Sequence, residues 1–105
     1  IGVMFLEGAA NPNLHAIWAT APGREAKAAV AFPIDAAAFM PKQGAAFRYE
    51  GSLTTPPCSE SVHWSIMATP VTASPSQIAA FASMFPNNAR PVQPLNRRYV
   101  LKTAG

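Results

Sequence analysis

SLTTPPCS, residues 52–59, places two threonines directly before two prolines and the only cysteine of the chain. A residue that precedes proline is restricted to extended conformations, and proline itself has no backbone N–H, so we predict a rigid loop here. A rigid loop can hold a hydroxyl and a free backbone N–H toward a cavity, as preorganised catalysis requires. The same composition also suits a simple connection between two strands, and the residues of the loop alone favour this second reading.

Two predicted strands flank this loop. Residues 47–50 alternate apolar and polar before it, and after it Val62, Trp64 and Ile66 share one face of a second strand. At the start of the sequence, residues 1–6 form an apolar run that fits a central strand covered on both faces. Because that run begins without an initiator methionine or a signal peptide, we expect the sequence to start inside a longer protein.

A first short helix is predicted after residues 1–6. Asn11 is a suitable N-cap, Pro12 fits the first helical position, and apolar residues follow at positions 14, 17 and 18. Gly23 is the expected end of this helix. Residues 31–41 combine short apolar pieces with two prolines, which indicates a strand end followed by one or two tight helical turns.

A second helix is predicted near the C-terminus. The sequence SPSQ, residues 74–77, has the pattern of a capping box with proline at the first helical position. Ile78, Phe81 and Phe85 are expected to form its buried stripe, and Pro86 to end it. A last short strand is expected at residues 98–102. The fold class predicted from these patterns is mainly β, a mixed and mostly antiparallel sheet with short peripheral helices.

The composition argues against several classes of partner. The chain has 105 residues, half of them apolar, and no apolar stretch long enough to cross a bilayer. Its net charge of +3 comes from basic residues that are dispersed apart from one Arg-Arg pair. Since a nucleic-acid surface normally clusters basic and aromatic side chains, and a membrane surface requires a basic amphipathic helix, we expect neither partner.

The candidate metal ligands are few. His15 and His63 are the only histidines, and neither belongs to an H-x-H or H-E-x-x-H pair, so no zinc site is predicted from this chain and both are interpreted as ordinary, partly exposed histidines. Cys58 has no second cysteine to pair with. It is either a buried thiol or one half of a disulfide whose mate lies outside this sequence, which would indicate an oxidising compartment.

The residues around the loop resemble a known family. The pattern Y-x-GSLTTPPCSE-x-V-x-W, residues 49–64, is similar to the signature around the substrate-binding threonines of the α-class carbonic anhydrases. The resemblance extends upstream through IGVMFLEG and ANPNL and downstream through NNARPVQPLNRR, which is similar to bacterial members. It implies that residues 1–105 are the C-terminal portion of one domain, part of a large twisted sheet, without the N-terminal region that carries the zinc ligands.

The resemblance also implies an activity, the reversible hydration of carbon dioxide to bicarbonate by zinc-bound hydroxide. The residue that matches Thr54 accepts a hydrogen bond from that hydroxide, and its backbone N–H meets an oxygen of bicarbonate or of an anionic inhibitor. Thr55 would add a second hydroxyl on the bicarbonate side. Leu53, Val62 and Trp64 would form the apolar wall beside carbon dioxide, which has no net dipole.

Other expectations rest on the resemblance alone. Zinc would be held by three histidines of the missing N-terminal portion of the same protein. Cys58 would form a disulfide to a cysteine near the N-terminus, which implies a periplasmic or secreted protein. A cis peptide is expected between Pro56 and Pro57. Arg90 and Gln93 are expected to tie down the C-terminal segment, as structural residues.

Two alternatives to an enzyme remain at this point. The first is a non-catalytic binding module that keeps the fold but has lost the zinc ligands. The second is a truncated or cleaved piece, inactive by itself, that persists only beside its other half. Such a piece would expose strand edges and apolar faces, which favour pairing with another chain or association into a homo-oligomer.

Overall fold

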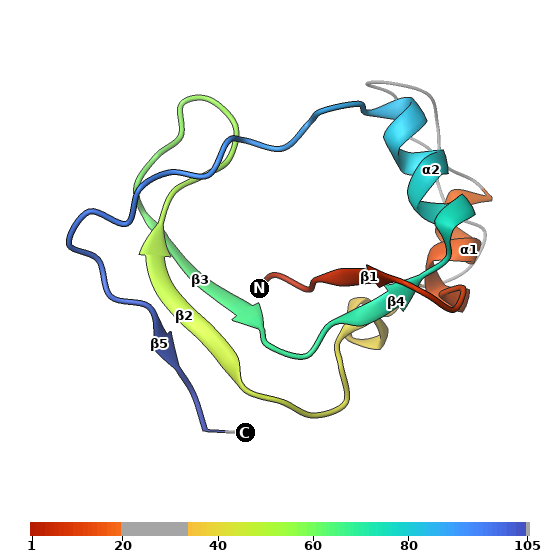
Figure 1. The fold of residues 1–105 in the computed structure, drawn as a ribbon, viewed down its shortest axis with the longest axis horizontal. Coiled ribbons are helices and arrows are strands. Elements are labelled where there is room, and N and C mark those ends of the chain that lie inside the picture. The colour runs from red at the N-terminus through yellow and green to blue at the C-terminus, as the bar shows by residue number, and fades with distance from the viewer. Residues whose placement is uncertain (20–33, 105) are drawn as a thin grey trace. The chain divides into compact units, whose positions relative to one another are not determined.

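The computed structural model describes residues 1–19 and 34–104. They form two compact units, one of Ile1–Met4, Pro41–Pro70 and Ala89–Gly105, and one of Phe5–Met40 and Val71–Asn88. The elements in chain order are β1 (Phe5–Glu7), α1 (Pro12–Trp18), the 3-10 helix η1 (Ala36–Phe39), β2 (Ala46–Gly51), β3 (Val62–Met67), β4 (Val71–Ala73), α2 (Pro75–Met84) and β5 (Leu101–Lys102) (Figure 1).

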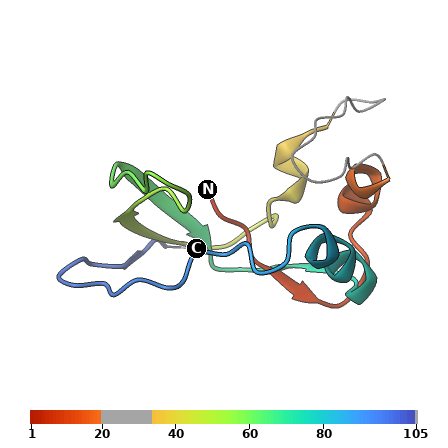
Figure 2. The ribbon, with the colours of Figure 1, turned by 90° about the horizontal axis from the view of Figure 1, so that it is seen from above.

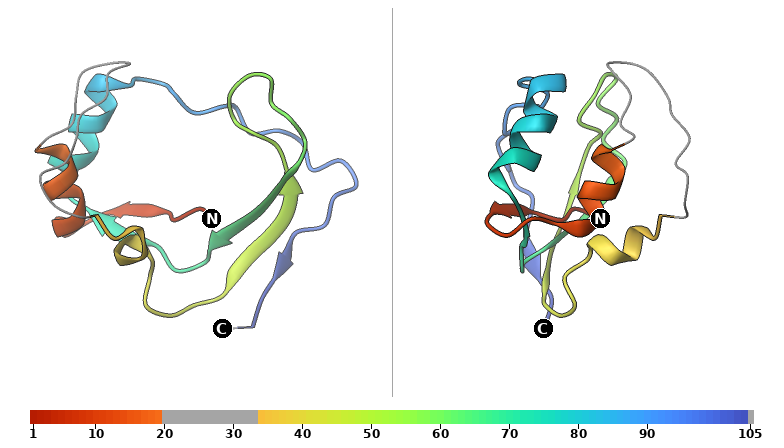
Figure 3. Two further views of the ribbon diagram at one scale, coloured as in Figure 1. Left: turned by 180° about the vertical axis from the view of Figure 1, so that it is seen from behind. Right: turned by 90° about the vertical axis from the view of Figure 1, so that its right-hand side faces the viewer.

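The first unit is built on a three-stranded antiparallel sheet in which β2 lies between β3 and β5 (Figure 3). β2 and β3 pair along their whole length, with Tyr49 opposite Trp64. Near the other edge of β3, the backbone of Gly2 donates to Ser65 O at 2.8 Å and accepts from Met67 N at 2.9 Å. The strands predicted on both sides of the threonine-proline loop are therefore confirmed. The strand predicted at residues 98–102 is shorter, since only Leu101–Lys102 pair with β2.

The second unit contains a parallel pair, β1 and β4, in register from Phe5 opposite Val71. The prediction of a strand at residues 1–6 is correct for its last residues only. Its predicted cover on both faces is wrong for the described part of the chain, because the side chains of Ile1, Met4 and Leu6 are 80%, 58% and 58% exposed. No described segment packs over these side chains closely enough to bury them. β4 was not predicted, because three residues are too few to display a period.

Both helices begin where the capping residues predict. At α1, Asn11 Oδ1 accepts from the N–H groups of Asn13 and Leu14, at 3.0 and 3.3 Å. At α2 the capping box is complete, with Ser74 Oγ accepting from Gln77 N at 3.2 Å and Gln77 Oε1 accepting from Ser74 N at 3.0 Å.

Of the two predicted helix ends, one is confirmed and one lies outside the described residues. α2 ends at Met84, before Pro86, as predicted. α1 ends at Trp18, and the predicted end, Gly23, lies outside the described residues, as does the strand end predicted before η1. The tight helical turn predicted in residues 31–41 is confirmed as η1. Among the described residues, no helix has both the length and the hydrophobicity that crossing a bilayer requires.

α1 and α2 lie side by side in the second unit (Figures 1 and 2). The rings of Trp18 and Phe81 stack with centroids 5.8 Å apart, and the ring centroids of Phe81 and Phe85 are 5.3 Å apart. Gln77 and Phe81 of α2 and its C-cap Phe85 follow one another at steps of four residues along one stripe. Phe81 and Phe85, which were predicted to be buried, are half-buried. The prediction that Ile78 is buried is wrong, because it lies next to this stripe and is 40% exposed, whereas Gln77 is only 8% exposed.

Candidate functional site

The threonine-proline loop joins β2 to β3 and lies within the first unit (Figure 1). Two backbone hydrogen bonds close it. Leu53 N donates to Ser59 O at 3.0 Å, and inside that ring Cys58 N donates to Thr55 O at 2.9 Å. The peptide between Pro56 and Pro57 is cis, as predicted. The loop is therefore a closed turn with few free backbone torsions, in line with the rigidity that the sequence predicts.

Ser52, the residue that follows β2, anchors the loop at its start. Its carbonyl oxygen accepts from Trp64 Nε1 at 3.1 Å, and its hydroxyl oxygen accepts from Arg90 Nη1 at 2.7 Å. The Ser52 hydroxyl in turn donates to Leu53 O at 2.9 Å. A strand residue and a residue of the C-terminal segment thus fix the same serine.

Thr54 and Thr55 follow Leu53 and are both exposed. No described residue forms a hydrogen bond with either hydroxyl or with the backbone N–H of Thr54. Thr54 lines a cavity of about 350 Å³ together with Trp64, whereas Thr55 does not line it. Thr54 therefore has the features required of a site residue, two unused hydrogen-bonding groups beside a hollow.

The predicted apolar wall is assembled only in part. Val62 and Trp64 share one face of β3 and are half-buried, but of the two only Trp64 lines the cavity beside Thr54. Leu53 is 42% exposed and lies outside the cavity lining. The remaining apolar lining comes from residues that the sequence did not indicate, Tyr49, Pro91, Val92 and Leu95.

Arg90 and Gln93 also line this cavity. Both were expected to tie down the C-terminal segment. Arg90 ties it to Ser52, 38 residues earlier in the chain, whereas the Gln93 amide donates to Pro91 O within the same segment, at 2.9 Å. No sequence period links positions 52 and 90, so the contact between Arg90 and the loop could not be predicted.

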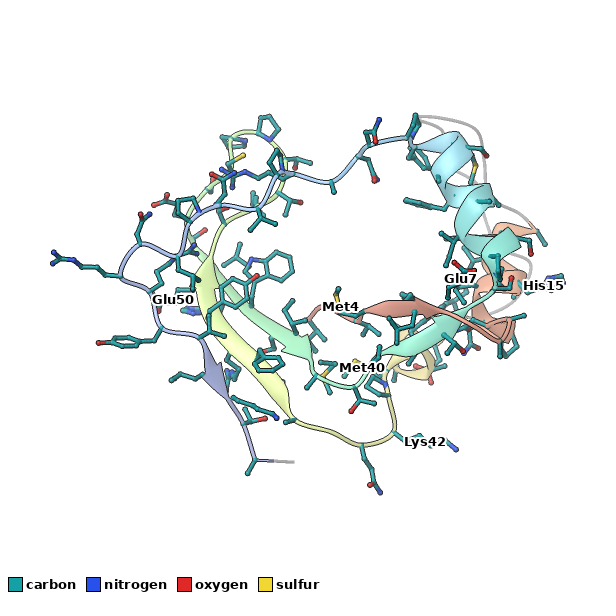
Figure 4. All side chains as sticks on the ribbon, in the orientation of Figure 1. Met4, Glu7, His15, Met40, Lys42 and Glu50 are labelled. Atoms are coloured by element: carbon teal, nitrogen blue, oxygen red, sulfur yellow. The ribbon has the colours of Figure 1, made fainter. Side chains whose placement is uncertain are left out.

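The described residues do not fit a zinc site. Within residues 1–19 and 34–104, no three His, Cys, Asp or Glu side chains lie close enough together to hold a metal ion. The exposed His15 projects from α1, and His63 lies 3.7 Å from Glu50 of β2, with both of these side chains more than 80% exposed (Figure 4). Such a pair is a surface contact and lacks the three or four converging ligands of a zinc centre.

Cys58 lies in the closed turn as a half-buried free thiol. Its backbone is in the left-handed region, with φ of 55°. Its side chain is therefore neither fully buried nor paired within the described residues, and both readings of this cysteine remain open.

The fold and the loop together define a class of protein, a domain of the carbonic anhydrase fold. Residues 1–104 match the sequence profile of the eukaryotic-type carbonic anhydrases. The chain belongs to the α-class carbonic anhydrase family.

Similar proteins agree with this assignment. The chain is 53% identical to a carbonic anhydrase of Nostoc sp. over 104 residues, which cover 97% of this chain and 39% of the relative. It is 46% identical over 103 residues to the carbonic anhydrase of Pectobacterium carotovorum, covering 96% and 42%. The chain thus spans about two fifths of the length of the curated relatives that it matches.

Solved structures with this fold are also similar to the chain. A hyperthermostable carbonic anhydrase from an active hydrothermal vent chimney superposes with a TM-score of 0.92 at 41% identity, covering 97% of this chain and 46% of that one. The α-carbonic anhydrase from Thermovibrio ammonificans, in complex with the inhibitor sulfanilamide, gives 0.88 at 42% identity, covering 93% and 44%. These matches confirm the predicted α-carbonic anhydrase fold.

Proposed function

We propose that this chain forms the substrate-binding side of a zinc carbonic anhydrase that converts carbon dioxide reversibly to bicarbonate and a proton. One observation carries the proposal. In a chain of this family, a closed loop holds Thr54 at the edge of a cavity with its hydroxyl and its backbone N–H unused by the described residues. A polar group exposed in this way can act on a substrate without first breaking a hydrogen bond within the protein.

The proposed roles follow from the chemistry of each group. The Thr54 hydroxyl accepts a hydrogen bond from the attacking hydroxide and fixes its direction, and the Thr54 N–H donates to an oxygen of bicarbonate. Thr55 adds a hydroxyl donor on the bicarbonate side. Leu53, Val62 and Trp64 provide apolar surface for carbon dioxide, which needs no hydrogen-bond partner.

Zinc belongs to another part of the protein in this proposal. It would supply hydroxide at neutral pH. We propose that three histidines in the segment that precedes this chain in the whole protein hold it, because the described residues offer no such group. Residues 1–105 then form the C-terminal portion of one domain, and further strands extend the two small sheets into one large twisted sheet.

A second candidate is an inactive piece or a zinc-free binding module of the same family. The missing cluster of metal ligands in the described residues favours it for the chain taken alone. The presence of both threonines, with Trp64 beside Thr54 in the cavity lining, argues against it for the whole protein. The sequence of the preceding segment distinguishes the enzyme from this second candidate, since only the enzyme requires three converging histidines there.

For Cys58 we propose a disulfide to a cysteine in the preceding segment, and therefore a periplasmic or secreted protein. The half-buried side chain and its place in a closed turn support a structural crosslink more than a packed core thiol. Mass spectrometry of the natural protein, alkylated with and without prior reduction, should find Cys58 protected only before reduction. Alkylation of Cys58 without reduction would contradict the disulfide.

Substitution of Thr54 by valine tests the central proposal. Valine has the shape of threonine and keeps the backbone N–H, so only the hydroxyl is lost. In a polypeptide that joins this chain to its preceding segment, we expect kcat/KM for carbon dioxide hydration, measured by stopped flow, to fall about a hundredfold with unchanged zinc content.

The matched control is Thr72→Val, which removes an exposed hydroxyl from β4 in the other unit. Valine suits a strand, so this control should keep full activity. A Thr54→Val protein with the kcat/KM of the unsubstituted protein would end the proposal that this loop takes part in catalysis.

A further inference from the structure

We propose that Arg90 is a positioning residue for Thr54, acting through the hydroxyl of Ser52. This inference rests on the proposed function, because it assigns Arg90 to the same site. It gives Arg90 a part in orienting the donor that meets the substrate, in addition to tying down the C-terminal segment.

The first step is the contact between Arg90 and Ser52. The guanidinium Nη1 lies 2.7 Å from Ser52 Oγ, at the short end of the usual range for N–H···O bonds. Ser52 is the only hydrogen-bond partner of Arg90 among the described residues, and no described carboxylate pairs with it. The positive charge of a half-buried arginine is therefore directed at one hydroxyl.

The second step is the orientation of that hydroxyl. Because its oxygen accepts from Arg90, the Ser52 hydroxyl can direct its proton only to another acceptor, and it donates to Leu53 O at 2.9 Å. A donor that is itself accepting a hydrogen bond from a cation is polarised and binds its acceptor more strongly. The carbonyl of Leu53 is thus held toward Ser52.

The third step is geometric. The carbonyl of Leu53 and the N–H of Thr54 belong to the same planar peptide group and point in opposite directions in a trans peptide. The bond that holds Leu53 O therefore also sets the direction of the Thr54 N–H. On the other side of the same residue, Leu53 N is held by Ser59 O at 3.0 Å. Arg90, Ser52 and this peptide group form one chain of contacts that ends at the donor beside the cavity.

Loss of Arg90 should free this peptide group to rotate. The Ser52 hydroxyl would then be free to donate elsewhere, and the Thr54 N–H would be aimed at the cavity for only part of the time. A purely structural role predicts a different result, in which the protein loses stability while the remaining folded molecules keep the affinity of the site. The two roles are separable because the first acts on one amide and the second on the whole fold.

The experiment compares Arg90→Ala, Ser52→Ala and the double variant in the polypeptide that includes the preceding segment. Three quantities are measured: kcat/KM for carbon dioxide hydration, the inhibition constant of sulfanilamide as an oxygen-bearing probe, and the NMR order parameter of the Thr54 amide, which reports rotation of its peptide group. Arg90→Ala should lower kcat/KM and raise the inhibition constant about tenfold or more, and it should lower the order parameter. The double variant should lose no more than Arg90→Ala alone, since both changes break the same chain.

Trp18→Phe is the matched control. It removes one side-chain hydrogen bond in the other unit, from Trp18 Nε1 to Gln77 O at 2.9 Å. It should lower the melting temperature without changing sulfanilamide binding or the order parameter of the Thr54 amide. Arg90→Lys retains a cation that can reach one acceptor, so it should recover part of the loss, and it serves as the test if Arg90→Ala does not fold.

Additive losses in the double variant, or an Arg90→Ala protein that loses stability but keeps its sulfanilamide affinity, would overturn the positioning role. A different result would contradict the proposed function itself. In that result, the unsubstituted protein holds no zinc and hydrates no carbon dioxide. In that case the order parameter of the Thr54 amide still decides whether Arg90 controls this peptide group.

Discussion

Gly51 leaves the space that the Trp64 indole requires. A Cβ added at this position would lie 2.8 Å from Cδ1 of Trp64 and 3.2 Å from its Nε1. That nitrogen holds the carbonyl of Ser52, so a side chain at position 51 disturbs the loop anchor directly. The indole is closely confined, since Tyr49, its cross-strand partner, would also lie 3.2 Å from the added carbon.

We therefore expect Gly51→Ala to displace the indole and to destabilise the protein by about 1–3 kcal/mol, the usual cost of overpacking. Urea unfolding of the polypeptide with its preceding segment measures the free energy, and tryptophan fluorescence reports the altered ring. Gly8→Ala is the matched control, because its Cβ would meet only the Thr72 side chain, at 3.2 Å. Equal stability losses in the two variants would show that the indole is not the cause.

At the scale of elements, Gln77 joins the starts of the two helices. Its Oε1 accepts from Asn11 N at 2.8 Å as well as from Ser74 N, and its Nε2 donates to Asn11 O at 2.7 Å. Asn11 is the N-cap of α1 and Ser74 the N-cap of α2, so one buried amide serves both caps. The relative placement of α1 and α2 depends on this side chain as much as on the stacked aromatic rings.

Gln77→Ala should therefore destabilise the protein by about 2–3 kcal/mol, because it leaves the part-buried N–H groups of Asn11 and Ser74 without their partner. Thermal or urea unfolding measures the change. Ser76→Ala, on the same turn of α2, removes only an exposed contact with Ser74 and should cost less than about 0.5 kcal/mol. If the two variants unfold alike, the amide does not join the helices.

The sequence predicted the features that depend on residues close together in the chain, and it did not predict contacts between residues far apart in the chain. The caps at Asn11 and Ser74, the strands on both sides of the loop and the closed turn depend on neighbours within a few residues, and the pattern of residue types records them. Gln77 was recognised as part of a capping box, but its bonds to Asn11 join positions 66 residues apart and leave no local pattern. The same holds for Arg90 and Ser52. Burial was predicted least well, because it depends on segments that pack from a distance.

At the scale of the whole molecule, apolar surface remains uncovered in both units. The only buried apolar side chains among the described residues are Ala45 and Ala73, and none of the larger ones is fully buried. Ile1 and Leu101 in the first unit and Leu6 in the second are large, apolar and more than half exposed. A domain without buried large side chains lacks the main source of folding free energy, so we propose that further polypeptide covers these surfaces.

The isolated 105 residues should accordingly behave differently from the longer protein. We expect them to bind a hydrophobic dye, to self-associate in analytical ultracentrifugation and to take up zinc no more tightly than isolated histidines do. Joining or adding the preceding segment should abolish dye binding and create one tight zinc site per molecule, because the same strands cover the apolar faces and carry the proposed ligands. A monomeric isolated chain that unfolds cooperatively and binds no dye would contradict the dependence on a second segment. Tight stoichiometric zinc in that chain would contradict the proposed location of the ligands.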